Sequence, residues 1–434
     1  MWSEAVYAES PQTQSSFHTA AVKERGSTMK AQDNLPANVL VVGGGITGIV
    51  AALRLAERGA SVVLVDRPLS AADNRIGGFA RFSGAKFSLP PAGLGLAPLA
   101  GSQARLLEVA MHCLALLGLP YLRSVESVDQ QATLAGEGEL RSYESIVLTP
   151  DEIECLLDRM EAHLKNAGVN VTYGTVDSLS PTGAGWETQI TLGGGSGPFD
   201  QTKVTSDAVF FAAGRLAEPL LEKAGAMPTE GKGLDVGFRI EFDELSGLQG
   251  LRRLGPDAKI IDGPCRTFCL NSPGKIYHYP FGELLIPGGV VADHTEVKGN
   301  VGILMRVSNK RESLSSFVDR ASPRAKELHA IGERVQVDPL FKLPSVVAHA
   351  YTPEIVSQLE QFCIMLHREQ LIDLRMPHRV HVPLLDWHWQ TWASRSSHQT
   401  SLKNIYALGD SSGHARGLLQ GAISGWLAAE EFLC

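Results

Sequence analysis

The sequence predicts a protein of the α/β class, in which a second, β-rich mixed domain is inserted into a discontinuous α/β domain. Three observations predict this organisation. From residue 37, a buried strand, a glycine-rich turn, a helix and another buried strand follow one another directly. Two further apolar strands, within 208–212 and 404–410, occur much later in the chain. The residues between them, from 230 to 390, favour strands, hairpins and proline-broken segments.

The first four elements form one βαβ unit. Residues 38–42 are apolar and β-branched, which is typical of a buried parallel strand. Residues 47–58 place apolar side chains at helical spacing, and Gly59 is a typical helix end. Residues 61–65 then form a second buried strand.

The elements after this unit are predicted from the same periodicities. A long loop rich in Gly, Ala, Pro and Ser at 71–98 precedes them, and the last 30 residues return to a strand followed by a helix. Helices are expected at 103–118, 150–167, 312–318, 323–332 and 353–368, and strands at 169–173, 186–192, 203–205 and 208–212.

Composition and charge exclude several classes of protein. Of the 434 residues, 44% are apolar and 20% are charged, as in ordinary globular chains. The formal net charge of −8 argues against a nucleic-acid or anionic-membrane partner. The sequence contains no run of 18 apolar residues, so no membrane-spanning helix is predicted. Six cysteines without a CxxC pair, and no recognisable signal peptide, predict reduced thiols in the cytoplasm.

The strongest motif is the GxGxxG pattern Gly43-Gly-Gly-Ile-Thr-Gly48, which lies between the first strand and helix. Gly43 permits a tight turn, Gly45 lets the backbone approach a pyrophosphate, and Gly48 lets helix and strand pack closely. The helix start offers free N–H groups to phosphate. Asp66, at the end of the second strand, is placed to accept both hydroxyls of an adenosine ribose. The sequence therefore predicts a bound dinucleotide.

Two later stretches favour FAD over NAD. The strand at 207–215 ends in Ala213-Gly214, and the strand at 404–410 ends in Gly409-Asp410 before a turn and a helix of small residues. This pattern resembles the FAD-binding pattern of flavoproteins with two dinucleotide-binding domains. The resemblance implies that the aspartate lies near the ribityl and pyrophosphate groups, and that the last helix points its N-terminus at the flavin pyrimidine edge.

Three stretches resemble the largely uncharacterised bacterial FAD-dependent dehydrogenases. They are Val236–Glu241, Cys265–Gly274 and the loop Gly77–Lys86. That loop usually reads Ser-Asp-Gly-Lys in the family but is Ser-Gly-Ala-Lys here, so the acidic residue is missing. The resemblance implies these cofactor-binding residues: Gly43, Gly45, Ile46, Thr47, Gly48, Asp66, Arg67, Gly77, Gly78, Phe79, Ser83, Lys86, Val176, Ala213, Gly214, Gly409, Asp410, Gly417, Leu418, Leu419 and Gln420.

The predicted organisation is a Rossmann-like, discontinuous FAD-binding domain with an inserted β-rich mixed substrate domain. A disordered extension is expected at 1–35. The expected domain boundaries are 36–90, 140–230 and 395–434 for the FAD-binding domain, and 91–139 and 231–394 for the substrate domain.

Residues 265–279 read as a β-hairpin that forms one wall of the substrate pocket. Alternation places Tyr277 and Tyr279 on one face and His278 on the other, and these three residues are the candidate catalytic acid–base groups. Cys265 and Cys269 stand too far apart on a strand to form a disulfide, and are expected to be packed or substrate-facing thiols. No zinc-binding spacing is found among the histidines, so no metal is expected.

The predicted function is that of an FAD-dependent oxidoreductase, a dehydrogenase or oxidase, that moves a hydride between flavin N5 and a small organic substrate. One alternative is a monooxygenase that uses free NAD(P)H, although no second GxGxxG marks a nicotinamide domain. Another is a flavoprotein with a redox-neutral or structural FAD. A tRNA-modifying flavoprotein is disfavoured by the acidic charge. Possible partners are thus a small-molecule substrate and free NAD(P)H or another electron partner.

Overall fold

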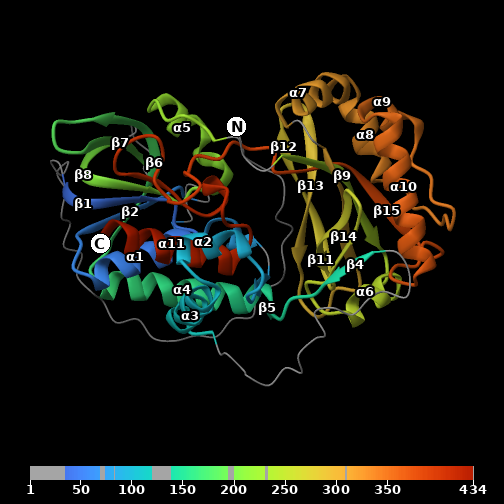
Figure 1. The fold of residues 1–434 in the computed structure, drawn as a ribbon, viewed down its shortest axis with the longest axis horizontal. Coiled ribbons are helices and arrows are strands. Elements are labelled where there is room, and N and C mark those ends of the chain that lie inside the picture. Colours follow the sequence, from blue (N-terminus) through green and yellow to red (C-terminus); the bar gives the residue numbers. More distant parts are fainter. Residues whose placement is uncertain are drawn as a thin grey trace, which may run out of the picture. The chain divides into compact units, whose positions relative to one another are not determined.

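The structure is a computed structural model, and it describes residues 35–68, 74–82, 84–119, 138–193, 200–229, 233–307 and 310–433. The expected N-terminal extension thus lies almost entirely outside the described residues. The described chain forms two six-stranded sheets, two two-stranded sheets and the helices that pack on them (Figure 1). This mixed α/β architecture confirms the predicted fold class.

The first sheet combines a parallel core with an antiparallel meander. Val41 of β1 pairs with Leu64 of β2 on one side and with Phe210 of β8 on the other. β6 pairs in parallel with β2 through residues 170–173 and antiparallel with β7 through residues 174–181. β8 pairs antiparallel with β7 through residues 201–206 and in parallel with β1 through residues 204–211, so the predicted short strands are parts of longer ones. The strands are β1 (Leu35–Val42), β2 (Val62–Asp66), β6 (Asn170–Pro181), β7 (Trp186–Leu192), β8 (Gln201–Phe211) and β16 (Ile405–Ala407).

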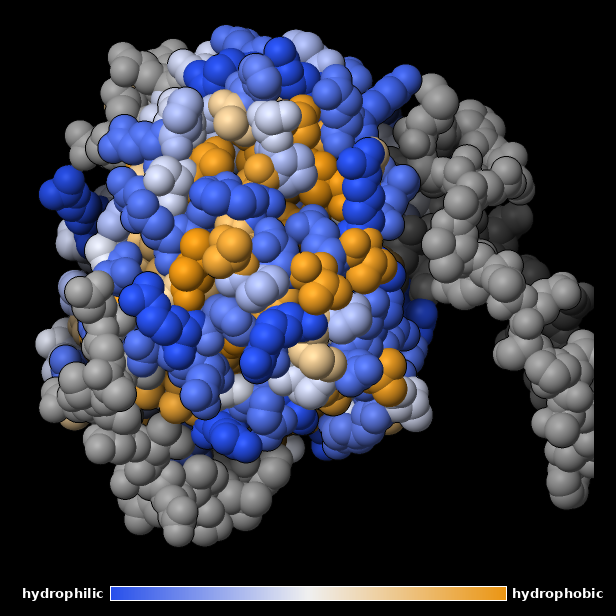
Figure 2. Space-filling model, turned by 90° about the vertical axis from the view of Figure 1, so that its right-hand side faces the viewer, coloured by the Kyte–Doolittle hydropathy of each residue, from blue (hydrophilic) through white to orange (hydrophobic). Residues whose placement is uncertain are grey.

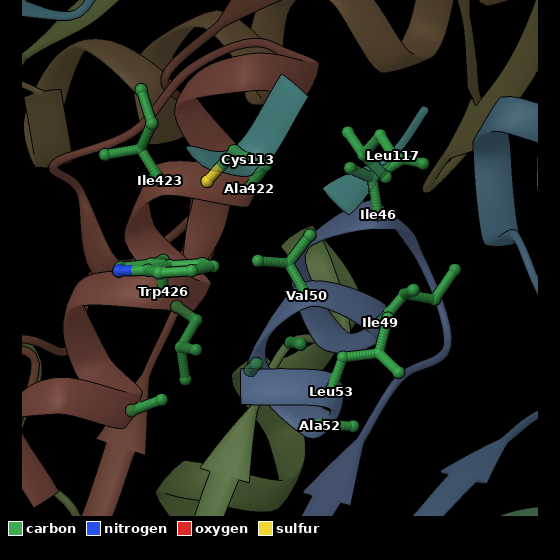
Figure 3. Close-up of a cluster of buried hydrophobic side chains, with 14 of the residues drawn as sticks. Ile46, Ile49, Val50, Ala52, Leu53, Cys113, Leu117, Ala422, Ile423 and Trp426 are labelled. Atoms are coloured by element: carbon green, nitrogen blue, oxygen red, sulfur yellow. The ribbon is translucent and has the colours of Figure 1, made fainter. Parts of the chain in front are cut away.

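Four helices cover one face of this sheet: α1 (Ile46–Glu57), α3 (Gln103–Leu116), α4 (Pro150–Asn166) and α11 (Leu418–Leu433). Figure 3 shows Val50 of α1, Cys113 of α3 and Trp426 of α11 in one apolar cluster. The sequence assigns 91–139 to the inserted domain, but α3 packs in this core because its apolar stripe faces α11. On the opposite face of the sheet, Trp186 of β7 shares a second apolar cluster with Leu221 and Trp392.

The second sheet is antiparallel, with the order β15-β9-β14-β11-β10-β4. β9 lies between β15 and β14, and every residue of β9 is buried. β4 joins this sheet from a part of the chain that precedes β9 by almost 100 residues, as the register of Leu140 with Ile260 shows. The strands are β4 (Glu139–Arg141), β9 (Leu234–Phe242), β10 (Lys259–Asp262), β11 (Cys265–Asn271), β14 (Gly299–Val307) and β15 (His378–Asp386).

The predicted hairpin at 265–279 is wrong in its pairing. β11 pairs with β10 and β14, whereas β12 (Gly274–Phe281) leaves this sheet and pairs only with β13 (Leu284–Val291). The tight turn at 271–274 directs β12 away from β11. One edge of β11 already pairs with β14. Both strands exist as predicted, but they belong to different sheets.

Helices α7 to α10 pack on the second sheet, and their buried residues share one core with β9 and β14. Figure 2 views this side of the molecule, where apolar side chains form separate spots among hydrophilic ones, as expected for amphipathic helices. The helices are α7 (Lys310–Ala321), α8 (Ala325–Ile331), α9 (Ser345–Ala350) and α10 (Pro353–Arg368).

The remaining elements are short. Among the described residues, no helix combines the length and the apolar character needed to cross a membrane. The short elements are β3 (Ala85–Ser88), β5 (Ser145–Leu148), α2 (Ala97–Ala100), α5 (Glu218–Lys223), α6 (Gln249–Arg253), and the 3-10 helices η1 (Gly78–Phe82), η2 (Leu94–Leu96), η3 (Gly214–Ala217), η4 (Leu245–Leu248), η5 (Ser322–Arg324) and η6 (Gly409–Ser412).

Candidate active site

The glycine-rich turn ends β1 and begins α1. Gly43 has a φ of +106°, and a Cβ there would lie 2.6 Å from the carbonyl oxygen of Ala212. A Cβ on Gly48 would collide with the carbonyl oxygen of Gly43, so only glycine lets the helix approach the turn. Gly45 is the N-cap of α1, has no side-chain cap, and faces open space. The first N–H groups of α1 are therefore free of a capping side chain.

Asp66 lies beside this turn. Its carboxylate would be 2.7 Å from a Cβ on Gly44, and it accepts a hydrogen bond of 3.1 Å from the backbone N–H of Arg67. Burial raises the pKa of Asp66 to about 6, although hydrogen bonds from the backbone of Gly44 and Arg67 oppose the shift. The carboxylate is thus short of donors, and ribose hydroxyls are donors of the right kind.

The η1 loop lies over the glycine turn. The N–H of Gly77 donates to the carbonyl of Gly44 at 2.8 Å, and a Cβ on Gly78 would be 3.7 Å from the Cα of Gly45. Arg81 anchors the loop by a 2.9 Å ion pair with Asp158 of α4. Ser83, predicted as a cofactor-binding residue in this loop, lies outside the described residues.

The C-terminal half of the site is formed by η6 and the start of α11. Gly409 has a φ of +61° and donates its N–H to Ser424 of α11 at 3.1 Å. Gly417 has a φ of +114° just before α11. Gln420 is 2% exposed, and its amide donates to the carbonyl of Ser88 at 2.8 Å. The side chain of Gln420 is therefore bound to the protein rather than presented to a ligand.

Two arginines hold Asp410. Arg215 Nε and Arg416 Nη1 each contact its carboxylate, at 3.2 and 3.0 Å. Both guanidinium groups also lie over the ring of Trp389, at 4.1 and 4.9 Å from its centroid. Arg416 further pairs with the buried Asp386 at 2.6 Å, so the loop before α11 is tied to β15 of the second sheet.

Strand β12 separates the candidate acid–base residues by face. Tyr277 and Tyr279 lie on one face, here called the tyrosine face. The ring centroids of Tyr277 and Tyr279 lie 6.0 Å apart, and the ring centroid of Tyr277 lies 5.2 Å from that of Phe79 in η1. Arg215 Nη1 donates to the hydroxyl of Tyr279 at 3.3 Å. The tyrosine face therefore meets both η1 and η3.

The ring of His278 lies on the other side of β12. Its ring centroid lies 5.1 Å from that of His329 and 5.5 Å from that of His381. Burial and these two histidines lower the pKa of His278 to about 4, so its imidazole is neutral at pH 7. The structure does not bring His278 together with the glycine turn.

The other residues predicted to bind the cofactor fall into three groups. Ala213 and Gly214 follow β8, and a Cβ on Gly43 would be 2.8 Å from the N–H nitrogen of Ala213. Leu419 is fully buried in the core and Val176 is buried within the meander, so their side chains pack rather than bind. The remaining positions lie at the start of α1, after β2, on β3 and at the start of α11: Ile46, Thr47, Arg67, Lys86 and Leu418.

Sequence reasoning missed Arg239 as a site residue. It is 1% exposed in the centre of β9, where it donates to the carbonyl of Cys269 at 3.0 Å and to Asn300 at 2.7 Å. Arg239 stands between the apolar residues Phe238 and Ile240, and a charged residue in an apolar stretch is a signal that the sequence carries. The contacts of Arg215 and Arg416 with Asp410 were also missed, because nothing local in the sequence indicates them.

The comparisons with known proteins agree with the glycine-turn geometry. Residues 38–124 match the family model described as DAO, FAD dependent oxidoreductase. The predicted cofactor, FAD, is confirmed by this match. No curated protein matches the chain. The narrower resemblance to bacterial FAD-dependent dehydrogenases stays a prediction.

Several solved structures are similar to the chain. A geranylgeranyl bacteriochlorophyll reductase-like protein from Thermoplasma acidophilum is 13% identical over 91% of this chain and 77% of its own, with a TM-score of 0.40. A flavoprotein/dehydrogenase from Cytophaga hutchinsonii is 13% identical over 92% and 79%, with a TM-score of 0.41. The OxyS anhydrotetracycline hydroxylase from Streptomyces rimosus is 14% identical over 92% and 63%, with a TM-score of 0.41.

The residues around the turn fit FAD. Open space in front of Gly45 and the uncapped start of α1 suit a pyrophosphate, and the donor-poor carboxylate of Asp66 suits an adenosine ribose. Asp410 departs from the expected FAD-binding pattern, because its carboxylate already forms ion pairs with Arg215 and Arg416. A ribityl hydroxyl bound at Asp410 would share that carboxylate with the two arginines.

Proposed function

We propose that this protein is an FAD-dependent oxidoreductase that oxidises or reduces a small organic substrate bound against the tyrosine face of β12. The match of residues 38–124 supports the class of enzyme. The observation that carries the substrate site is the pair of contacts from the tyrosine face to the predicted FAD loops. Tyr277 contacts Phe79 of η1, and Arg215 contacts both Tyr279 and Asp410.

Bound FAD supplies a centre, N5, that accepts or donates a hydride. The chain supplies the polar contacts and the proton. Burial raises the pKa of Tyr277 to about 12, so its hydroxyl is protonated at neutral pH and is able to donate a hydrogen bond to a substrate. Tyr279 accepts from Arg215, which leaves its own hydroxyl hydrogen for a substrate oxygen or nitrogen. We propose that the proton accompanying hydride transfer passes through a tyrosine hydroxyl.

This proposal is tested by anaerobic stopped-flow measurement of flavin reduction, after a screen for organic substrates that bleach the flavin. Tyr277→Phe, Tyr279→Phe and His278→Ala are compared at saturating substrate. A general acid or base contributes roughly 10²–10⁴-fold, so at least one tyrosine variant is expected to lose about a hundredfold in rate. His278→Ala is the matched control on the opposite face and is expected to stay within about threefold of wild type.

Retention of FAD, measured by absorbance, shows that each variant is folded. If both tyrosine variants reduce flavin within about threefold of wild type, the tyrosine face is scaffold and the acid–base assignment fails. If free NAD(P)H alone bleaches the flavin rapidly and repeatedly, the monooxygenase alternative replaces the dehydrogenase reading. If neither bleaches it, the redox-neutral alternative stands.

A further inference from the structure

The second sheet has one apolar face and one polar face. Alternate residues of β9 pack in the core that this sheet shares with α7 to α10: Val236, Phe238, Ile240 and Phe242. The charged residues between them, Asp235, Arg239 and Glu241, therefore face the other way. The β12–β13 hairpin lies on this polar face, because the ring of His278 contacts that of His381, which pairs with Arg239 in the register of β15 with β9. Charged groups are thus buried between the sheet and the hairpin.

Most charges on the polar face have an opposite charge beside them. Asp235 and Asp386 both pair with Arg266, and Glu241 lies 4.0 Å from Arg379. Arg239 differs, because among the described residues no carboxylate forms an ion pair with its guanidinium. Arg239 is also only 1% exposed, so water does not replace the missing partner. A buried cation without a counter-ion is costly, and this position therefore favours an anion.

One edge of the Arg239 guanidinium is occupied and the other is free. Nη1 donates to the carbonyl of Cys269 at 3.0 Å and to Oδ1 of Asn300 at 2.7 Å. Strand β13 closes over Nη1, since a Cβ on Gly289 would lie 2.4 Å from it. On the other edge, Nε is buried without a hydrogen-bond partner, and Nη2 donates to no described residue. The N–H groups of Nε and Nη2 point the same way and form a planar fork, which fits two oxygens of a planar oxyanion.

A second polar atom without a partner lies on the residue next to Arg239 across the sheet. The buried Nε2 of His381 makes no hydrogen bond, and the carboxylate of Glu241 is 3.5 Å from it. Lys298 and Arg379, each at 4.0 Å, offset the charge of Glu241. An imidazole that carries its proton on Nε2 is a donor. Two orphaned nitrogens on neighbouring residues of one buried face thus indicate a missing acceptor, and the unpaired charge of Arg239 indicates that this acceptor is negative.

We propose that Arg239 is the centre of an anion-binding site between the second sheet and the β12–β13 hairpin, and that this site takes a small planar oxyanion, either an organic carboxylate or an inorganic ion such as nitrate. The anion supplies the missing counter-ion. Because Gly289 of the hairpin lies against the same guanidinium, an anion that fixes Arg239 also holds the hairpin on the sheet. The site does not depend on the proposed oxidoreductase reaction, in which Arg239 and His381 have no assigned role.

The experiment is hydrogen exchange of the FAD-loaded protein, measured by peptide mass spectrometry with sodium acetate, sodium nitrate or sodium chloride at equal ionic strength. A bulky sulfonate buffer salt is the blank. Acetate or nitrate at ten times its Kd is expected to slow exchange of residues 274–291 roughly tenfold, because only the unliganded hairpin opens. Chloride has no pair of oxygens for the fork and is expected to protect less. Residues 186–192 of β7 are the internal reference and should exchange alike in all salts.

The two oxyanions distinguish the sources of the ligand. Protection by acetate but not nitrate assigns the site to organic acids, and protection by nitrate but not acetate assigns it to inorganic oxyanions. Either result supports the site.

Two substitutions make the test specific. Arg239→Met removes the charge and is expected to abolish the protection, whereas Arg239→Lys keeps the charge without the fork and is expected to lose the preference over chloride. Arg379→Met is the matched control, because this cation already has Asp243 as its partner, and it should behave as wild type. Flavin absorbance shows that each variant is folded. The proposal is overturned if neither acetate nor nitrate protects residues 274–291 of wild type more than chloride does, or if Arg239→Lys keeps the wild-type preference.

Discussion

At the scale of single residues, Asp66 joins the cofactor to the stability of the protein. Its carboxylate is partly buried beside the glycine turn and receives two backbone hydrogen bonds, too few to compensate for lost hydration. FAD would add the missing donors through its ribose. The same residue is therefore expected to weaken the empty protein and strengthen the complex.

We expect Asp66→Ala to weaken FAD binding by about 1.5–3 kcal/mol, or roughly 10- to 150-fold in Kd, the usual contribution of hydrogen bonds to a charged group. Titration of the protein freed of FAD, followed by flavin fluorescence, measures this. An unchanged Kd would remove Asp66 from the FAD site.

In the FAD-free protein, the ionised carboxylate of Asp66 is expected to lower the stability of the fold. The folded pKa of Asp66, about 6, lies above the ordinary value of 3.8, so its contribution to stability is complete below 3.8 and is lost as pH rises through 6. Asp66→Asn stays neutral and is expected to be more stable than wild type by about 1–3 kcal/mol at pH 8. Urea unfolding at several pH values measures the difference, which should vanish near pH 4. If Asp66→Asn is less stable than wild type at pH 8, burial of the ionised carboxylate does not destabilise the FAD-free protein.

At the scale of elements, the contact of α1 with α11 fixes the start of α1. Gly421 and Gly425 of α11 face Thr47, and a Cβ at either position would overlap the hydroxyl or the carbonyl of Thr47. The helices therefore approach through glycine, and the N–H groups that we assign to the pyrophosphate depend on this contact.

Gly425→Ala is expected to destabilise the protein by about 1–3 kcal/mol, because its Cβ meets a backbone atom that has no free rotation. The FAD content after purification is expected to fall as well. The matched control is Gly183→Ala, whose Cβ meets nothing within 4 Å and which should change stability by less than about 0.5 kcal/mol. Equal melting temperatures for the two variants would contradict the close contact.

At the scale of the whole molecule, charged residues link the second sheet to the FAD loops. Asp235 and Asp386, both buried, share Arg266, and Asp386 also binds Arg416, which binds Asp410. The alternating signs let each buried charge face an opposite one. The carboxylates come from β9, β15 and η6, so this series of charges links residues as far apart as Asp235 and Asp410, which are 175 positions apart in the sequence.

Asp386→Asn is expected to destabilise the protein by about 3–5 kcal/mol at pH 7, because it leaves Arg266 and Arg416 without their shared carboxylate. Although burial opposes ionisation, Arg416, Arg266 and Arg215 lower the pKa of Asp386 to about 2. Its contribution is therefore present above the ordinary value of 3.8 and is lost as pH falls toward 2. The gap between variant and wild type should narrow by about 1 kcal/mol from pH 7 to pH 3.

Urea unfolding at both pH values measures this gap. The control is Glu187→Gln, which breaks the exposed 2.8 Å pair with Lys203 and is expected to cost less than about 1 kcal/mol. If Asp386→Asn is as mild as the control, the buried chain of charges contributes nothing to stability.

The sequence alone predicted the α/β class, the βαβ unit and a bound dinucleotide, because each depends on neighbouring residues. The choice of FAD came from a resemblance carried by the later stretches 207–215 and 404–410. Gly43, Gly45, Gly48 and Asp66 fall within one strand–turn–helix–strand, whose period and spacing are local properties. The same holds for the predicted helix at 353–368, where Thr352 caps α10 and the apolar stripe is continuous.

Only the tertiary structure decided which strands and side chains meet. Local pattern identifies β11 and β12 as strands, but whether they pair depends on competition with β14 and β13, which lie outside the window that a pattern describes. The same limit applies to α3, which packs with α11, and to Lys86, which reaches β11 across 184 residues. Periodicity records which side of an element is buried, whereas the partner is chosen by packing and charge across the whole chain.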